Sequence, residues 1–150
     1  MNALIEPLLL WHDDYGLGLA EIDQQHQKLF RLMNQVWDAV IEQDDTPLHA
    51  TDLIRELEEY AQNHFDAEER FMAETGYPRL DCHKKAHDAF VRRLHQEKDA
   101  MLDGSWISIS LLQFLRDWLI SHILVADREY AAHAGFVPPC ERVEEELLSA

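Results

Sequence analysis

Apolar residues recur every three to four positions over four long segments of this chain, a period typical of amphipathic helices. The glycines and prolines fall at the ends of these segments or outside them, as in the runs 44–47 (DDTP) and 76–78 (GYP). Asp23 and Thr46 are predicted N-caps, because a carboxylate or hydroxyl accepts a bond from the first free backbone N–H groups. The predicted helices span about Asp23 to Gln43, Pro47 to Thr75, Leu80 to Asp103 and Ser108 to Ala134.

Short connections between long helices favour antiparallel neighbours. The sequence therefore predicts an all-α fold, an antiparallel up-down-up-down four-helix bundle. We expect one domain over residues 1–150, with the bundle at about 23–134. Residues 1–22, which include Trp11, are predicted to form an N-terminal arm, and residues 136–150 a short acidic C-terminal tail.

The charge balance excludes several classes of partner. With 29 acidic against 13 basic residues the formal net charge is −16, which repels nucleic acid and anionic lipid surfaces. No stretch approaches the ~20 consecutive apolar residues of a membrane span, and residues 1–10 lack the basic region of a signal peptide. We therefore expect a cytoplasmic protein without membrane insertion. The two cysteines, Cys82 and Cys140, form no C-x-x-C pair, so we expect them to be structural or incidental.

Five histidines and two carboxylates stand on the apolar faces of the predicted helices. His64 and Glu68 are four residues apart, as are His83 and His87, and this spacing projects each pair from one side of a helix. Either pair alone has little weight, because composition gives about one His-x3-Glu pair by chance. The complete set carries the argument and consists of His26, His64, Glu68, His83, His87, His122 and Asp127.

A bound metal is the simplest partner for these inward polar groups, since each would cost about 2–7 kcal/mol if buried unpaired. Because the set contains no cysteine, iron–sulfur clusters and structural zinc are disfavoured. Imidazole with carboxylate suits iron, manganese or zinc, and two carboxylates able to bridge favour a dinuclear octahedral site. If an oxo or hydroxo bridge completes that site, one coordination position stays open for a small neutral molecule such as O2 or NO.

Five stretches of sequence carry a resemblance to a known family. They are IDQQH at 22–26 with LF at 29–30, HFDAEERFM at 64–72, GYP at 76–78, HKKAH at 83–87 followed by AF, and WLISHILVADREY at 118–130. Together they resemble the hemerythrin family, specifically the single-domain bacterial hemerythrins, over roughly residues 11–132. The resemblance implies a four-helix bundle that holds two iron ions and takes O2 as its ligand.

The resemblance also implies a role for each ligand. It places His83, His87 and His122 on one iron and His26 and His64 on the other. Glu68 and Asp127 would bridge the two irons. The ions would alternate between Fe2+ and Fe3+ with an oxo or hydroxo bridge. O2 would bind at the open position of the iron that has two histidines.

Apolar neighbours of the ligands are candidates for an O2 pocket that excludes water. They are Leu29, Phe65, Trp118, Leu119 and Ile123. Plain packing of the core explains each of these side chains equally well.

The leading functional hypothesis is reversible O2 binding, as a carrier, store or delivery protein and not as an enzyme. A delivery role would add an O2-consuming protein as partner. One alternative is a di-iron oxidase, peroxidase or NO-handling enzyme, although a site rich in imidazole disfavours strongly oxidising chemistry. The other is an O2 or redox sensor that acts through a partner, with the arm or the tail as its output.

Overall fold

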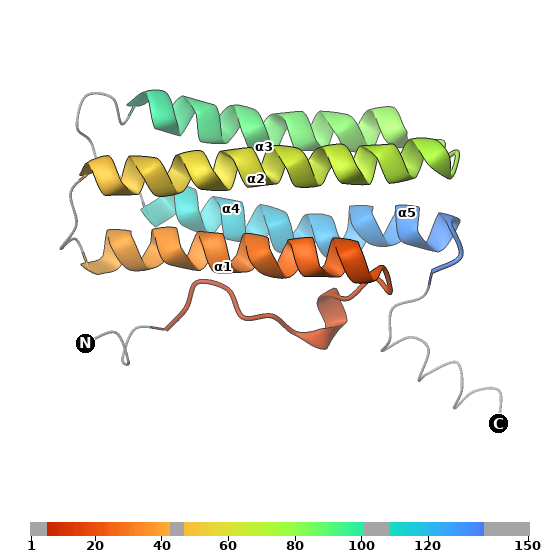
Figure 1. The fold of residues 1–150 in the computed structure, drawn as a ribbon, viewed down its shortest axis with the longest axis horizontal. Helices are drawn as coiled ribbons and strands as arrows, with labels where there is room; N and C mark the ends of the chain where they lie inside the picture. Colours follow the sequence, from red (N-terminus) through yellow and green to blue (C-terminus); the bar gives the residue numbers. More distant parts are fainter. Residues whose placement is uncertain (1–5, 43–46, 101–108, 137–150) are drawn as a thin grey trace.

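Four long helices lie side by side with alternating directions in the computed structural model, which describes residues 6–42, 47–100 and 109–136 (Figure 1). Their bounds are α1 Ala20–Glu42, α2 Pro47–Glu74, α3 Leu80–Ala100 and α4 Ile109–Ser121. A π-helical segment, His122–Asp127, and α5, Arg128–His133, continue α4. Helix α1 packs on α2 and α4, and α2 packs on α3. The predicted all-α bundle with antiparallel neighbours is confirmed.

The first helix begins three residues earlier than predicted, so Asp23 is not its N-cap. Asp23 lies in the first turn of α1, and its carboxylate accepts hydrogen bonds from the backbone N–H groups of Leu17 and Gly18, at 2.8 and 3.3 Å. The prediction was wrong because a carboxylate one turn inside a helix can reach back to the preceding loop. Gly18 has φ +86° there, a conformation that side chains with a Cβ rarely adopt.

The second helix begins at Pro47, as predicted, and ends at Glu74. Gly76 has φ +69°, and the backbone N–H of Tyr77 then bonds to the carbonyl of Met72 at 2.9 Å, which closes the last turn. Several predictions fall outside the described residues: the N-cap Thr46, the ends of the first and third helices, the start of the fourth helix at Ser108, and all of the tail predicted at 136–150 except its first residue.

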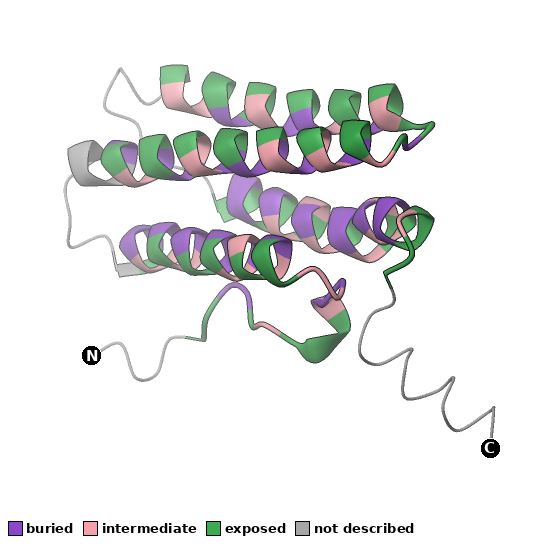
Figure 2. Ribbon diagram, turned by 45° about the vertical axis from the view of Figure 1, so that its right-hand side comes forward, coloured by how far each residue is buried: buried purple, intermediate pink, exposed green. Residues whose placement is uncertain are grey.

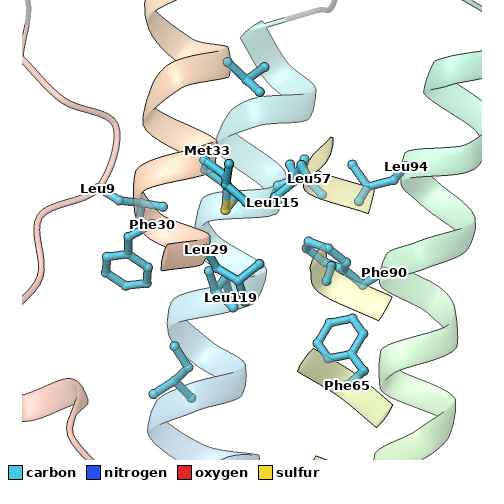
Figure 3. Packing of buried hydrophobic residues seen from close by; sticks show 14 of the residues in the cluster. Leu9, Leu29, Phe30, Met33, Leu57, Phe65, Phe90, Leu94, Leu115 and Leu119 are labelled. Atoms are coloured by element: carbon cyan, nitrogen blue, oxygen red, sulfur yellow. The ribbon is translucent and has the colours of Figure 1, made fainter. Parts of the chain in front are cut away.

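Each helix turns its apolar face inward, and buried and exposed stripes alternate around the bundle (Figure 2). Leu29 of α1 and Leu119 of α4 point toward each other in the centre, with Phe65 and Phe90 from α2 and α3 beyond them (Figure 3). This packing fixes the inward faces on which the predicted ligands stand.

The N-terminal arm lies along α1 (Figure 1). The Asn34 side chain accepts a bond from the Leu9 N–H and donates one to the Leu9 carbonyl, both at 2.8 Å. Trp11 packs edge-on against Phe30 with ring centroids 5.3 Å apart. Two hydrogen bonds between the Leu9 backbone and the Asn34 side chain, together with this aromatic contact, therefore hold the arm against α1.

The continuous helix Ile109–His133 is long and apolar enough, by length and composition alone, to cross a membrane. Its most apolar window has a mean hydropathy of 1.3, and 33% of that window is buried. This finding differs from the expectation that no segment could span a membrane. That expectation rested on the number of consecutive apolar residues, whereas the average hydropathy of a window tolerates a few polar ones. The core helix of a bundle passes the same test, and this helix places Leu111, Leu115 and Leu119 in the core.

Candidate metal centre

All seven predicted ligands meet in the centre of the bundle. One comes from α1, two from α2, two from α3 and two from the π-helical segment, and none is more than 7% exposed. Their donor atoms form two groups with mutual distances of at most 4.8 Å. The groups are Glu68, His83, His87, His122 and Asp127, and His26, His64 and Glu68.

The two oxygens of Glu68 face opposite sides of this cluster. Glu68 Oε1 lies 3.0 Å from His26 Nε2 and also contacts His64 Nε2. Glu68 Oε2 lies 3.4 Å from both His83 Nε2 and His87 Nε2. One carboxylate thus touches a pair of histidines with each oxygen.

Asp127 is arranged in the same way. Its Oδ1 lies 3.0 Å from His83 Nε2 and 3.2 Å from His122 Nε2, whereas its Oδ2 lies 3.2 Å from His26 Nε2. The histidines therefore divide into a side with His83, His87 and His122 and a side with His26 and His64. Each carboxylate presents one oxygen to each side.

The π-helical segment explains how His122 and Asp127 come to face the same way. Residues five apart in an α-helix point in different directions, because each residue turns the helix by about 100°. Between His122 and Asp127 the backbone is instead π-helical, and hydrogen bonds from i to i+5 give residue i+5 the place that i+4 takes in an α-helix. The sequence analysis predicted an uninterrupted α-helix here and missed this segment.

Two further polar side chains orient the imidazole rings. His64 Nδ1 lies 2.7 Å from Gln25 Oε1, and His87 Nδ1 lies 3.0 Å from Glu69 Oε2. When Nδ1 donates its proton to these oxygens, the lone pair of Nε2 is aimed at the cluster, as in most metal-binding histidines. Sequence reasoning missed both residues, since each merely adjoins a ligand in the chain and has no spacing signal of its own.

The charges in the cluster shift the ionisation of its members. Burial alone lowers the pKa of His26 and of His83, but the adjacent, negatively charged carboxylates of Asp127 and Glu68 outweigh it and raise each pKa to about 9. Burial dominates for His64 and lowers its pKa. Burial raises the pKa of Glu68 and of Asp127, yet the neighbouring histidines bring both below their usual range. Both carboxylates are thus anionic at neutral pH.

Several donor atoms approach one another closely without the geometry of a hydrogen bond. They are His64 Nε2, His83 Nε2, Glu68 Oε2 and both carboxylate oxygens of Asp127. Buried polar atoms are rarely left without a partner, and a cation between the two sides would give all of them one. The donor set of imidazole and carboxylate therefore fits iron or a similar divalent metal.

Two of the five apolar residues proposed for the O2 pocket contact ligands of the cluster. Phe65 stacks on the His87 ring with centroids 3.9 Å apart, and Trp118 stacks on the His122 ring at 4.4 Å. These two rings therefore cover histidines on the three-histidine side. The other three, Leu29, Leu119 and Ile123, are at most 1% exposed, whereas Trp118 is half-buried.

Comparisons with known proteins agree with this geometry. The family model of the hemerythrin HHE cation binding domain matches residues 17–134. The bacteriohemerythrin of Clostridium acetobutylicum is 35% identical over 127 residues, which cover 82% of this chain and 98% of the relative. The bacteriohemerythrin of Stenotrophomonas maltophilia is 34% identical over 124 residues, 83% of this chain and 80% of the relative. A crystal structure of wild-type hemerythrin superposes with a TM-score of 0.78 at 25% identity, covering 85% of this chain and 98% of that structure. With its fold, its buried cluster and these relatives in agreement, the chain belongs to the hemerythrin family.

Proposed function

We propose that this protein binds O2 reversibly at a non-heme di-iron centre and serves as an O2 carrier, store or delivery protein. One observation carries the proposal: each of two buried carboxylates contacts two histidines of the three-histidine side with one oxygen and at least one histidine of the two-histidine side with the other oxygen. This arrangement suits two ions that share both carboxylates.

The contacts support an assignment of the ligands to two ions. His83, His87 and His122 would hold one iron, His26 and His64 the other, and Glu68 and Asp127 would bridge them with an oxo or hydroxo group. When bound, the two irons supply the electrons for reversible O2 binding. Because one side offers one histidine fewer, it leaves a coordination position for an external ligand.

The chain contributes orientation and exclusion of water. Gln25 and Glu69 hold the rings of His64 and His87 so that Nε2 points inward. Leu29, Leu119 and Ile123 are almost completely buried and lie within three residues of a proposed ligand in the chain, and an apolar wall built by them would keep protons and water from bound iron.

The net charge of −16 disfavours nucleic acid and anionic membranes as partners. The proposal also includes a cytoplasmic location without membrane insertion, as expected from the absence of a signal-peptide pattern and of a long consecutive apolar run. If O2 is delivered, the partner is a protein that consumes it.

A sensing role is the second candidate, and one contact of the arm favours it. The short helix Asp13–Tyr15 of the arm packs on the π-helical segment, and the Arg128 guanidinium donates a hydrogen bond to the Asp14 carbonyl. Because Arg128 follows Asp127 directly, a shift of that carboxylate would reach the arm. A sensor would lose its response to O2, but not its O2 affinity, when residues 1–15 are removed.

The proposed function is tested by anaerobic loading of the full chain with Fe2+, metal analysis and O2 titration. We expect two irons per chain and an optical change with O2 that reverses under vacuum. Fewer than two irons per chain, or a spectrum that never reverses, would contradict the proposal. Continuous O2 or peroxide consumption would favour the enzymatic alternative.

A further inference from the structure

A small surface pocket is lined by one of the proposed metal ligands, His83. It lies between the start of α3 and the junction of the π-helical segment with α5, and its volume is about 110 Å³. Arg79, Cys82, His83, Ala86 and Glu129 are among the residues that line it. This volume has room for a few water molecules, or for an ion that keeps part of its hydration shell.

His83 joins the pocket to the cluster. Its side chain is 3% exposed, whereas those of His26, Glu68 and Asp127 are completely buried. His122 is also slightly exposed, at 5% of its side chain, but of these two histidines it is His83 that lines the pocket. An ion in the pocket would therefore meet His83 before any other proposed ligand.

The lining offers metal-binding groups from the surface inward. Cys82 is exposed and supplies a thiol, Glu129 supplies a carboxylate, and His83 supplies an imidazole. Cys82 and Glu129 do not belong to either described group of donor atoms within 4.8 Å, so they suit brief contacts with an ion and not its storage. The net charge of −16 raises the concentration of cations near the whole surface.

A cation stands at the rim of the pocket. Arg79 Nη1 lies 3.0 Å from Glu129 Oε2, and the Tyr77 hydroxyl donates to the same oxygen at 3.1 Å. The side chains of Arg79 and Glu129 are 62% and 46% exposed, and exposed ion pairs of this kind open readily. While it is closed, the pair neutralises Glu129 and places a positive charge in the way of a metal ion.

We propose that this pocket is the passage through which Fe2+ enters and leaves the metal centre, with Arg79 limiting the flow of cations. The inference rests on the proposed di-iron site. It explains how metal reaches ligands that are almost completely buried without unfolding of the bundle. Binding of O2 plays no part in it, so kinetics of metal uptake and loss provide the test.

The first variant fills the pocket. Ala86 is half-buried in α3 and lines the pocket, so Ala86→Leu should slow uptake of Fe2+ by the metal-free full chain severalfold. The matched control is Ala67→Leu, because Ala67 is also half-buried, also precedes a ligand and lines a different pocket of about 380 Å³. Equal slowing by both variants, or none by Ala86→Leu, would overturn the inference.

The second variant changes charge at the rim in the opposite direction. Arg79→Ala removes a cation from the path and should accelerate uptake by roughly fivefold, the effect of one unit charge near contact in a water-rich mouth. Arg70→Ala is the control, since Arg70 lines the other pocket and its loss changes the net charge equally. Acceleration by both variants alike would show a general charge effect and contradict a local passage.

A third measurement avoids any effect of the substitutions on folding. In a Cys140→Ser background, Cys82 is alkylated with iodoacetamide after the metal-free protein has folded. We expect slower Fe2+ uptake and slower extraction by a ferrous chelator, with an unchanged iron content at saturation. Unchanged rates would overturn the passage, whereas an unmodified protein that never binds two irons would contradict the proposed function itself.

Discussion

His26 and His83 are the two histidines that lie against both carboxylates of the cluster. His26 Nε2 is 3.0 Å from Glu68 and 3.2 Å from Asp127, and His83 Nε2 is 3.4 and 3.0 Å from the same residues. A proton on either Nε2 would therefore lie between the imidazole and the carboxylates, where the proposed metal would bind. A proton and a metal ion compete for the same nitrogen atoms, so binding of metal must release protons.

We expect this release to depend on pH in a defined direction. With both pKa values raised to about 9, His26 and His83 carry protons at pH 7.5, and Fe2+ must displace them. Above about pH 10 the rings are already neutral and this contribution disappears. Calorimetry of anaerobic Fe2+ binding in buffers of different ionisation enthalpy measures the protons released. A proton release that does not fall between pH 7.5 and 10 would contradict this account.

Leu119 tests the water-excluding wall of the proposed O2 pocket. It is 1% exposed and stands three residues before His122, so Leu119→Ala should admit water and accelerate autoxidation to the ferric form severalfold. The substitution should also cost about 2–5 kcal/mol of stability, because it leaves a cavity. Leu115→Ala is the matched control, since Leu115 is equally buried one turn further from the cluster. The decay of the oxygenated spectrum is the measurement, and equal decay in both variants would argue against this wall.

At the scale of single elements, the π-helical segment compensates for the spacing of five residues between His122 and Asp127. It contains one residue more per turn than an α-helix would, and Val125, 59% exposed, faces solvent within it. The extra residue lets His122 and Asp127 share a face despite their spacing of five. The pairs on α2 and α3 need no such segment, because His64 and Glu68 are already four apart.

Shortening this segment by one residue should therefore preserve the metal centre, whereas lengthening it should not. Deletion of Val125 gives a spacing of four in a regular α-helix, so we expect two irons per chain to be retained. Insertion of an alanine after Val125 should rotate Asp127 away and abolish binding of the full complement. Metal analysis with far-UV circular dichroism measures both effects, and Val125→Ala serves as the control of unchanged length. Loss of iron in the deletion, with helicity retained, would show that the π-helical geometry itself is needed.

At the scale of the whole molecule, the features visible in the sequence are those set by local periodicity. Pro47 and Leu80 begin helices where predicted, and the pairs at spacing four project together. Asp23 was wrongly predicted as an N-cap, because the preference of aspartate for helix ends does not show that this carboxylate reaches back to the backbone N–H of Leu17. Contacts between helices, such as that of Gln25 with His64, depend on the packing of two faces and leave no periodic signal.

Metal and fold should be coupled, because the proposed ligands come from α1, α2, α3 and the π-helical segment that continues α4. An ion that binds the folded chain alone adds about 4 kcal/mol at a thousandfold excess over its Kd. At about 150 residues each kcal/mol shifts Tm by ~2–4 °C, so anaerobic loading with Fe2+ should raise Tm by roughly 10 °C. His95→Ala, at a side chain 56% exposed and away from the cluster, should keep this increase, whereas Asp127→Ala should lose most of it. Differential scanning calorimetry measures Tm with and without iron. An equal Tm in both states would contradict stabilisation of the folded chain by bound metal.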